Sequence, residues 1–226
     1  MHIEPGLVTG PKIFLSYATA AAAGAYTLKL ALDDIREKGL TSLSARSVLT
    51  TALVFMFFEI MPHYPIGVSE VHFIFASTLF LIFGPAPAAI GLALGLSTQG
   101  LFFEPQDIPQ YGMNVTTLLV PLFGLSALAS RIIKPDTPYV DLRYSQALAL
   151  STSYQGGVVL WVAFWALYGG GLTEENLSSV LAFGGAYMLV VLIEPLADLA
   201  VLAIAKTFRG LSDNWLFNQR LHNAAG

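Results

Sequence analysis

The amino terminus and two histidines are the groups in this sequence best suited to bind a transition metal. A terminal amine followed by His2 can chelate through the amine, the deprotonated backbone nitrogen of His2 and the imidazole. These three nitrogens lie naturally in one plane, and one further imidazole, such as that of His72, would complete a square. Planar nitrogen sets suit Ni(II) or Cu(II), whereas Zn(II) prefers a tetrahedron. The residues therefore predict a metal site formed by Met1, His2 and His72.

Plainer interpretations of the same residues stay open at this point. His2 need not be a ligand, and His72 could cap a helix or lie at a membrane interface. His63 lies between two prolines in a loop, where we expect it to be solvated. Other polar residues expected on the same side of the membrane could support the ligands: Glu4, Glu59, Glu70 and Asn114.

The composition indicates an integral membrane protein. The chain has 226 residues, of which 55% are hydrophobic and only 12% are charged, and its mean hydropathy is +0.65. Soluble domains carry about 25% charged residues, so about half the usual charge is missing. The absence of Cys excludes disulfides and thiolate metal sites. The net charge of −4, with 11 Lys and Arg, argues against nucleic-acid binding.

Seven apolar runs predict an all-α transmembrane bundle of about seven helices, with six as the alternative. A membrane-spanning helix needs about 20 mostly apolar residues. The runs are Ile13–Leu32, Val48–Met61, Val71–Phe83, Ala86–Phe103, Met113–Ile133, Ala147–Tyr168 and Leu177–Ala205. The third is short for a full span, and Pro195 should kink the last. We expect residues 1–226 to form a single transmembrane domain, with a metal-binding segment at 1–12.

The basic residues predict the orientation in the membrane. Ten of the 11 Lys and Arg flank the first connection, the fifth connection or the end of the last helix, and seven alternating helices put these regions on one side. By the positive-inside rule that side is the cytoplasm, so the N-terminus faces out. Lys12 is the exception. The loop Asp33–Ala45 and the cytoplasmic tail at 209–226 are the only sizeable soluble pieces expected, and no cleavable signal peptide precedes the first helix, so we expect the mature protein to begin at Met1.

Two further features lie within the apolar runs. Glu194 lies well inside the last run and is by default a functional candidate, although it could equally pair with another helix and fix packing. Asp198 follows one turn later on the same face, and we expect it to lie nearer the cytoplasm, where water solvates it. Small residues form close-approach faces on the first helix, at Ala18, Ala22 and Ala25, and on the fourth, at Gly91 and Gly95. Packing within the chain is the commoner role of such faces.

Several segments resemble the cobalt/nickel permeases of the CbiM/NikM family. They are Met-His-Ile at the start, Pro-Ile-Gly-Val-Ser-Glu-Val-His at 65–72, Phe-Gly-Pro-Ala-Pro-Ala-Ala at 83–89, Gln-Gly-Leu-Phe-Phe at 99–103, Gly-Met-Asn-Val at 112–115 and Leu-Ile-Glu-Pro-Leu at 192–196. The resemblance is scattered over most of the chain. The sequence departs from the family pattern at Glu4, one position before the usual Asp, and at Pro195, where Gly is usual.

This resemblance implies a function and partners. It implies the substrate-binding component of an energy-coupling factor transporter in the bacterial cytoplasmic (inner) membrane, which takes up Ni(II) or Co(II) through Met1, His2 and His72. Ala18, Ala22 and Ala25 would then dock a transmembrane coupling subunit. The chain has no P-loop and no other nucleotide site, so partner ATPases would hydrolyse ATP and the chain itself would not be an enzyme. The alternative, which the departures favour modestly, is a non-transporting subunit or assembly factor of a larger metalloenzyme complex in the membrane.

Overall fold

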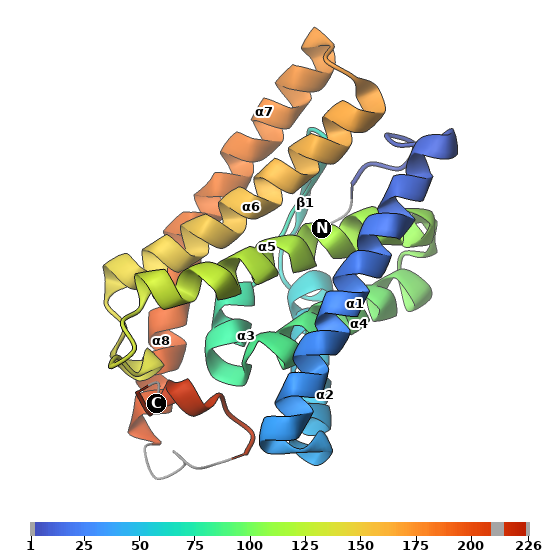
Figure 1. Cartoon of the computed structure of the whole chain (residues 1–226). Helices are drawn as coiled ribbons and strands as arrows, with labels where there is room; N and C mark the ends of the chain where they lie inside the picture. The colour runs from blue at the N-terminus through green and yellow to red at the C-terminus, as the bar shows by residue number, and fades with distance from the viewer. Residues whose placement is uncertain (1–2, 209–214, 225–226) are drawn as a thin grey trace.

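Helices make up most of the fold in the computed structural model, which describes residues 3–208 and 215–224. The α-helices are α1 (Ile13–Lys38), α2 (Leu40–Glu59), α3 (Ala76–Phe83), α4 (Pro85–Phe102), α5 (Tyr111–Ile132), α6 (Tyr144–Gly170), α7 (Glu174–Met188) and α8 (Glu194–Thr207). Long helices surround the short α3, and α6 and α7 form an antiparallel pair (Figure 1). Among the described residues, four helical stretches are long and apolar enough to cross a membrane: Leu40–Glu59, Pro105–Ile132, Tyr144–Gly170 and Glu174–Thr207. The prediction of a helical membrane protein is therefore confirmed.

The predicted loop at 33–45 is wrong, because both flanking helices continue into it. α1 runs on to Lys38 and α2 begins at Leu40. The reversal takes place at Gly39, whose φ of 83° lies in the left-handed region that favours glycine. Polar residues in this region therefore extend the helices beyond the apolar runs at 13–32 and 48–61.

The third apolar run, predicted as a helix from Val71, is helical only from Ala76. Before it lies a β-hairpin, β1 (Tyr64–Ile66) and β2 (Ser69–Val71), paired antiparallel with Ile66 opposite Ser69. The fold is thus not purely α-helical. The apolar run begins inside β2, at Val71, and hydropathy alone does not mark where a strand ends and a helix begins. Residues 72–75 belong to neither β2 nor α3.

The last apolar run contains two helices and a break, which confirms the disruption predicted at Pro195. α7 ends at Met188, and the 3₁₀ turn η4 (Leu189–Leu192) connects it to α8. Pro195 lies in the first turn of α8, where its missing N–H is tolerated. The break places Glu194 at the beginning of a helix instead of in the middle of one.

The glycine pair on α4 packs within the chain. A Cβ added at Gly91 would meet Thr50, and one at Gly95 would meet Val54, both on α2. The close approach lets the Thr50 hydroxyl donate to the Pro87 carbonyl at 2.7 Å. Contact within the chain, the commoner role of such a face, is therefore what the structure shows for Gly91 and Gly95.

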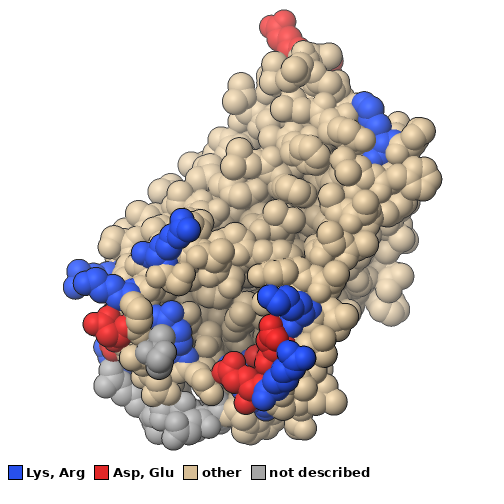
Figure 2. Space-filling view, viewed as in Figure 1, with Lys and Arg blue, Asp and Glu red and all other residues tan. Residues whose placement is uncertain are grey.

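Basic side chains are unevenly distributed along the molecule. On the face drawn in Figure 2, most Lys and Arg lie toward the end with the C-terminus and the α1–α2 turn, and a broad uncharged band lies above them. Arg46 is fully buried there, paired with Asp34, and its Nη1 donates to the Phe83 carbonyl at 2.8 Å. The backbone N–H of Asn218 donates to the Ile82 carbonyl at 2.7 Å. Both groups bind carbonyls at the C-terminal end of α3.

Candidate metal site

The beginning of the described chain is tied to the hairpin and to α5. Ile3 is fully buried, bridges Ser69 in antiparallel fashion, and donates its backbone N–H to Asn114 Oδ1 at 3.0 Å. The backbone N–H of Glu4 donates to the Val68 carbonyl at 3.2 Å. Asn114 therefore anchors the N-terminal segment. The predicted ligands Met1 and His2 lie outside the described residues.

His72 is a buried imidazole held by a carboxylate. Its side chain follows β2, its exposure is 1%, and its Nε2 lies 2.8 Å from Glu70 Oε2. An ionised carboxylate only accepts hydrogen bonds, so Nε2 carries the proton, and in the neutral ring Nδ1 carries the lone pair. A carboxylate that orients an imidazole in this way is typical of metal-binding histidines. The structure thus brings together His72 and Glu70.

His63 is not the solvated loop residue that we expected. Its ring is half-buried and stacks on that of His72, with centroids 4.9 Å apart and planes differing by 10°. A metal bound to an imidazole lies in the plane of that ring, and two nearly parallel stacked planes do not share an in-plane position. His63 therefore packs against His72 and is not placed to bind the same ion. The stacking pairs residues nine positions apart across the hairpin turn, which no local spacing indicates.

The other two predicted supporting residues, Glu59 and Glu4, contact other parts of the chain. Glu59, at the end of α2, is 3.5 Å from Gln99 Nε2, and Gln99 is fully buried. Glu4 lines an open pocket of about 330 Å³ together with Gly67 and Glu175. His72 lines a different pocket, of about 190 Å³.

Glu194 and Asp198 both reach the N-terminal end of α3. Glu194 is fully buried; its Oε1 accepts the backbone N–H groups of Ile74 at 3.1 Å and Phe75 at 3.0 Å, and its Oε2 accepts Gln155 Nε2. Glu194 therefore pairs with groups on other elements, including Gln155 on α6, which was one of the two roles considered for it. Asp198 was expected to be solvated, but it is buried and accepts the hydroxyls of Ser77, at 2.8 Å, and Thr78. The prediction for Asp198 was wrong because its hydroxyl partners lie about 120 residues away in the sequence.

A comparison with protein families identifies the fold. The family described as the cobalt uptake substrate-specific transmembrane region, CbiM, matches residues 2–210. The chain belongs to the CbiM family. Its fold is shared by a crystal structure of a truncated transition metal transporter, 20% identical, with a TM-score of 0.72 over 92% of this chain and 99% of the other. A second crystal structure, of a transition metal transporter, is also 20% identical, with a TM-score of 0.61 over 98% of this chain and 96% of the other. No curated protein matches the sequence.

Membership of the CbiM family supports a role in transition-metal transport in a membrane. Within residues 3–208 and 215–224, no three His, Cys, Asp or Glu side chains come together to hold a metal ion. The predicted ligands Met1 and His2 lie outside these residues.

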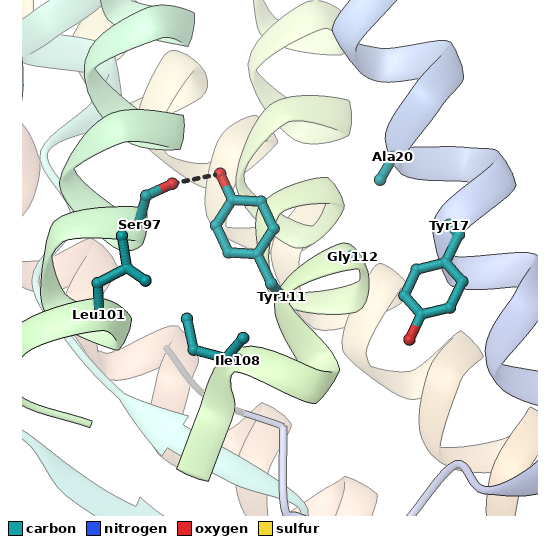
Figure 3. Close-up of a pocket in the computed structure, with 7 residues that line it drawn as sticks. All are labelled: Tyr17, Ala20, Ser97, Leu101, Ile108, Tyr111 and Gly112. Carbon is teal, nitrogen blue, oxygen red and sulfur yellow. Dashed lines mark hydrogen bonds between the residues drawn. The ribbon is translucent and has the colours of Figure 1, made fainter. Parts of the chain in front are cut away.

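Two surfaces of this CbiM-family chain are apolar and open. Ala18, Ala22 and Ala25 are exposed on α1. A pocket of about 410 Å³ lies between α1, α4 and the start of α5, lined by Tyr17, Ala20, Ser97, Leu101, Ile108, Tyr111 and Gly112. Tyr111 and Ser97 hydrogen-bond each other at 2.9 Å at one side of it (Figure 3). Its apolar lining does not suit a metal ion.

Proposed function

We propose that this chain is the substrate-binding membrane component of a Ni(II) or Co(II) uptake transporter, with Met1, His2 and His72 as metal ligands. The observation that carries the proposal is the position of Ile3. Its bridge to Ser69 ties the residue that follows His2 to the strand that leads into His72. Each residue spans at most about 3.6 Å of chain. Met1 and His2, which directly precede Ile3, can therefore approach His72, which is three residues after Ser69.

The surroundings of His72 also suit metal binding. Glu70 orients the imidazole with Nδ1 as the lone-pair nitrogen, and Phe58, 5.6 Å from the ring centroid, excludes water from one side. Asn114 fixes the backbone at Ile3. Of the four predicted supporting residues, Glu70 and Asn114 are therefore the two that we retain for that role, because each binds a ligand or the segment that leads to one.

The test of this proposal is metal binding by the purified protein. We expect His72→Ala and His2→Ala to abolish Ni(II) and Co(II) binding, measured by elemental analysis and calorimetric titration, because each removes one nitrogen of the set. One residue added before Met1 should have the same effect, because it displaces the amine. His222→Ala, in the tail, is the matched control and should bind as the unchanged protein does. Wild-type stoichiometry in His72→Ala would exclude the site.

The partners proposed are a transmembrane coupling subunit and ATPases. The exposure of Ala18, Ala22 and Ala25 supports this, because small residues on a lipid-facing helix let another helix approach closely. Ala22→Trp should prevent co-purification of the coupling subunit while metal binding persists, and Leu160→Trp, at an exposed position on α6, should change neither. Loss of metal binding in Ala22→Trp, or an intact complex, would contradict the assignment of this face.

We further propose seven passes through the bacterial inner membrane, with the N-terminus outside. Lys12, the basic residue on the outer side in this orientation, supports it. Its Nζ donates to the carbonyls of Tyr168, at 2.8 Å, and Gly169, at 3.2 Å. A cation at the C-terminal end of α6 is stabilised by the free carbonyls and by the helix dipole, which explains a Lys on a side otherwise rich in acids.

A further inference from the structure

We infer that Glu194 and Asp198 are positioning residues, a carboxylate clamp on the N-terminal end of α3 that holds His72 where a metal can reach it. The inference rests on the proposed function of His72 as a ligand. Neither carboxylate is assigned a contact with the metal. Both act through the backbone and hydroxyl groups of residues 74–78.

The segment that carries His72 depends on the clamp for its backbone hydrogen bonds. Residues 72–75 lie between β2 and α3 and belong to neither. The N–H groups of Ile74 and Phe75 both donate to Glu194 Oε1. Buried N–H groups need such acceptors, because water does not reach them. Glu194 thus fixes Ile74 and Phe75, which follow His72 by two and three positions.

Phe75 shows that this segment is held against its own preference. Its φ of 52° is the one positive value among the non-glycine residues that the structure describes. A bulky residue in the left-handed region persists only where the surroundings enforce it. The Glu194 bond to the Phe75 N–H supplies that enforcement at this residue.

Asp198 fixes the first turn of the helix that follows. Asp198 lies one helical turn after Glu194, on the same face of α8. It accepts hydrogen bonds from the hydroxyls of Ser77 and Thr78. Two carboxylates at a helix N-terminus also complement its dipole. The contacts therefore join α3 to α8 as one unit, and His72 lies at the outer end of that unit.

The clamp connects the metal site to the break between α7 and α8. α8 begins directly after the 3₁₀ turn η4, a kind of interruption that often marks a hinge. A change in the direction of α8 at this point moves Glu194 and Asp198, and with them the backbone after His72. The position of α8 therefore sets the position of a metal ligand.

The experiment compares Glu194→Ala and Glu194→Gln in the full chain by two readouts. The first is hydrogen exchange of the backbone at residues 72–78 in metal-free protein. The second is Ni(II) affinity together with the visible absorption of the bound ion, which reports its coordination geometry. Val162→Ala, a buried substitution on α6 away from the clamp, controls for general loss of stability.

Glu194→Ala should raise exchange at residues 72–78 at least tenfold, weaken Ni(II) binding at least tenfold and alter its spectrum. Glu194→Gln should stay within threefold of the unchanged protein in both readouts, because an amide oxygen still accepts both N–H groups. Gln155 can turn to meet the new amide, since its Oε1 has no partner among the described residues. Val162→Ala should leave the spectrum unchanged.

Four results would overturn the inference. Unchanged hydrogen exchange at residues 72–78 in Glu194→Ala excludes the clamp, regardless of the Ni(II) affinity of that variant. Equal loss in Glu194→Gln and Glu194→Ala assigns the effect to the negative charge and not to the hydrogen bonds. Metal binding that persists in His72→Ala overturns the proposed ligand, and the metal-free exchange readout separates that failure from failure of the clamp. If Glu194→Ala does not fold, the double variant Ser77→Ala, Thr78→Val removes the donors to Asp198 and should raise exchange there at least threefold; unchanged exchange in it also overturns the inference.

Discussion

At the scale of single residues, the buried charged groups of Arg46, Glu194 and Asp198 are each held by specific partners. Arg46 has an exposure of 0%, and it is held by Asp34 and by the carbonyls of Ser42 and Phe83. A guanidinium in an apolar environment is tolerated only with such partners. Arg46 therefore depends strongly on Asp34, whereas an exposed pair on the same helix, Asp33 with Arg36, does not carry comparable weight.

We predict that Asp34→Ala destabilises the protein by about 3–5 kcal/mol, because it leaves a buried charge without its counter-ion. Asp33→Ala, in the exposed pair, should change the stability by no more than about 1 kcal/mol. Unfolding of the detergent-solubilised protein by increasing denaturing detergent measures both. Equal effects of the two substitutions would show that burial does not distinguish these ion pairs.

At the scale of elements, the structure is built around the short helix α3, whose two ends are held by groups from other parts of the chain. Glu194 and Asp198 bind its N-terminal end, and Arg46 and Asn218 bind carbonyls at its C-terminal end. Eight residues make a helix too short to be stable alone. Packing and capping by partners distant in sequence therefore decide where it begins and ends.

This dependence explains how far the sequence predicts the elements. Hydropathy locates a helix within every apolar run, and Pro195 correctly marks a disruption. The hairpin at 64–71 escapes prediction because each of its strands has only three residues, too few to show an alternating pattern. The start of α3 depends on Glu194, which lies about 120 positions after Ile74 in the sequence. The residues around α3 alone do not reveal such a distant partner. For the site, residue types indicate His72 and Glu70, but the stacking of His63 depends on the turn geometry alone.

The α2–α4 contact gives a prediction at the same scale. Gly91→Ala should lower the thermal midpoint of the purified protein, because its Cβ would collide with Thr50, and overpacking costs about 1–3 kcal/mol. Gly124→Ala is the matched control on α5, since a Cβ there meets nothing within 4 Å. It should leave the midpoint unchanged or raise it slightly, because Ala is the better helix former. A lower midpoint in Gly124→Ala alone would contradict this account of the packing.

At the scale of the whole molecule, the distribution of charge and the position of the N-terminal segment lead to one further prediction, the orientation in the membrane. The chain has no Cys, so single cysteines report their side without a background. Leu172, 78% exposed between α6 and α7, should react as Cys with a membrane-impermeant maleimide on intact cells. Asp136, exposed between α5 and α6, should react as Cys only after permeabilisation. The reverse pattern would place the basic connections outside and contradict the positive-inside argument.

The same labelling also determines the side from which a metal arrives. Lys12 donates to the Gly169 carbonyl, three positions before Leu172, so the α6–α7 turn and the N-terminal segment lie at the same end. Ile3, in that segment, bridges the hairpin that leads into His72. Labelling of Leu172→Cys from outside therefore places the proposed ligands at the outer face, where a component of uptake must first meet its ion. Protection of Leu172→Cys on intact cells would instead require the metal to enter this site from the cytoplasm, and uptake through it would be excluded.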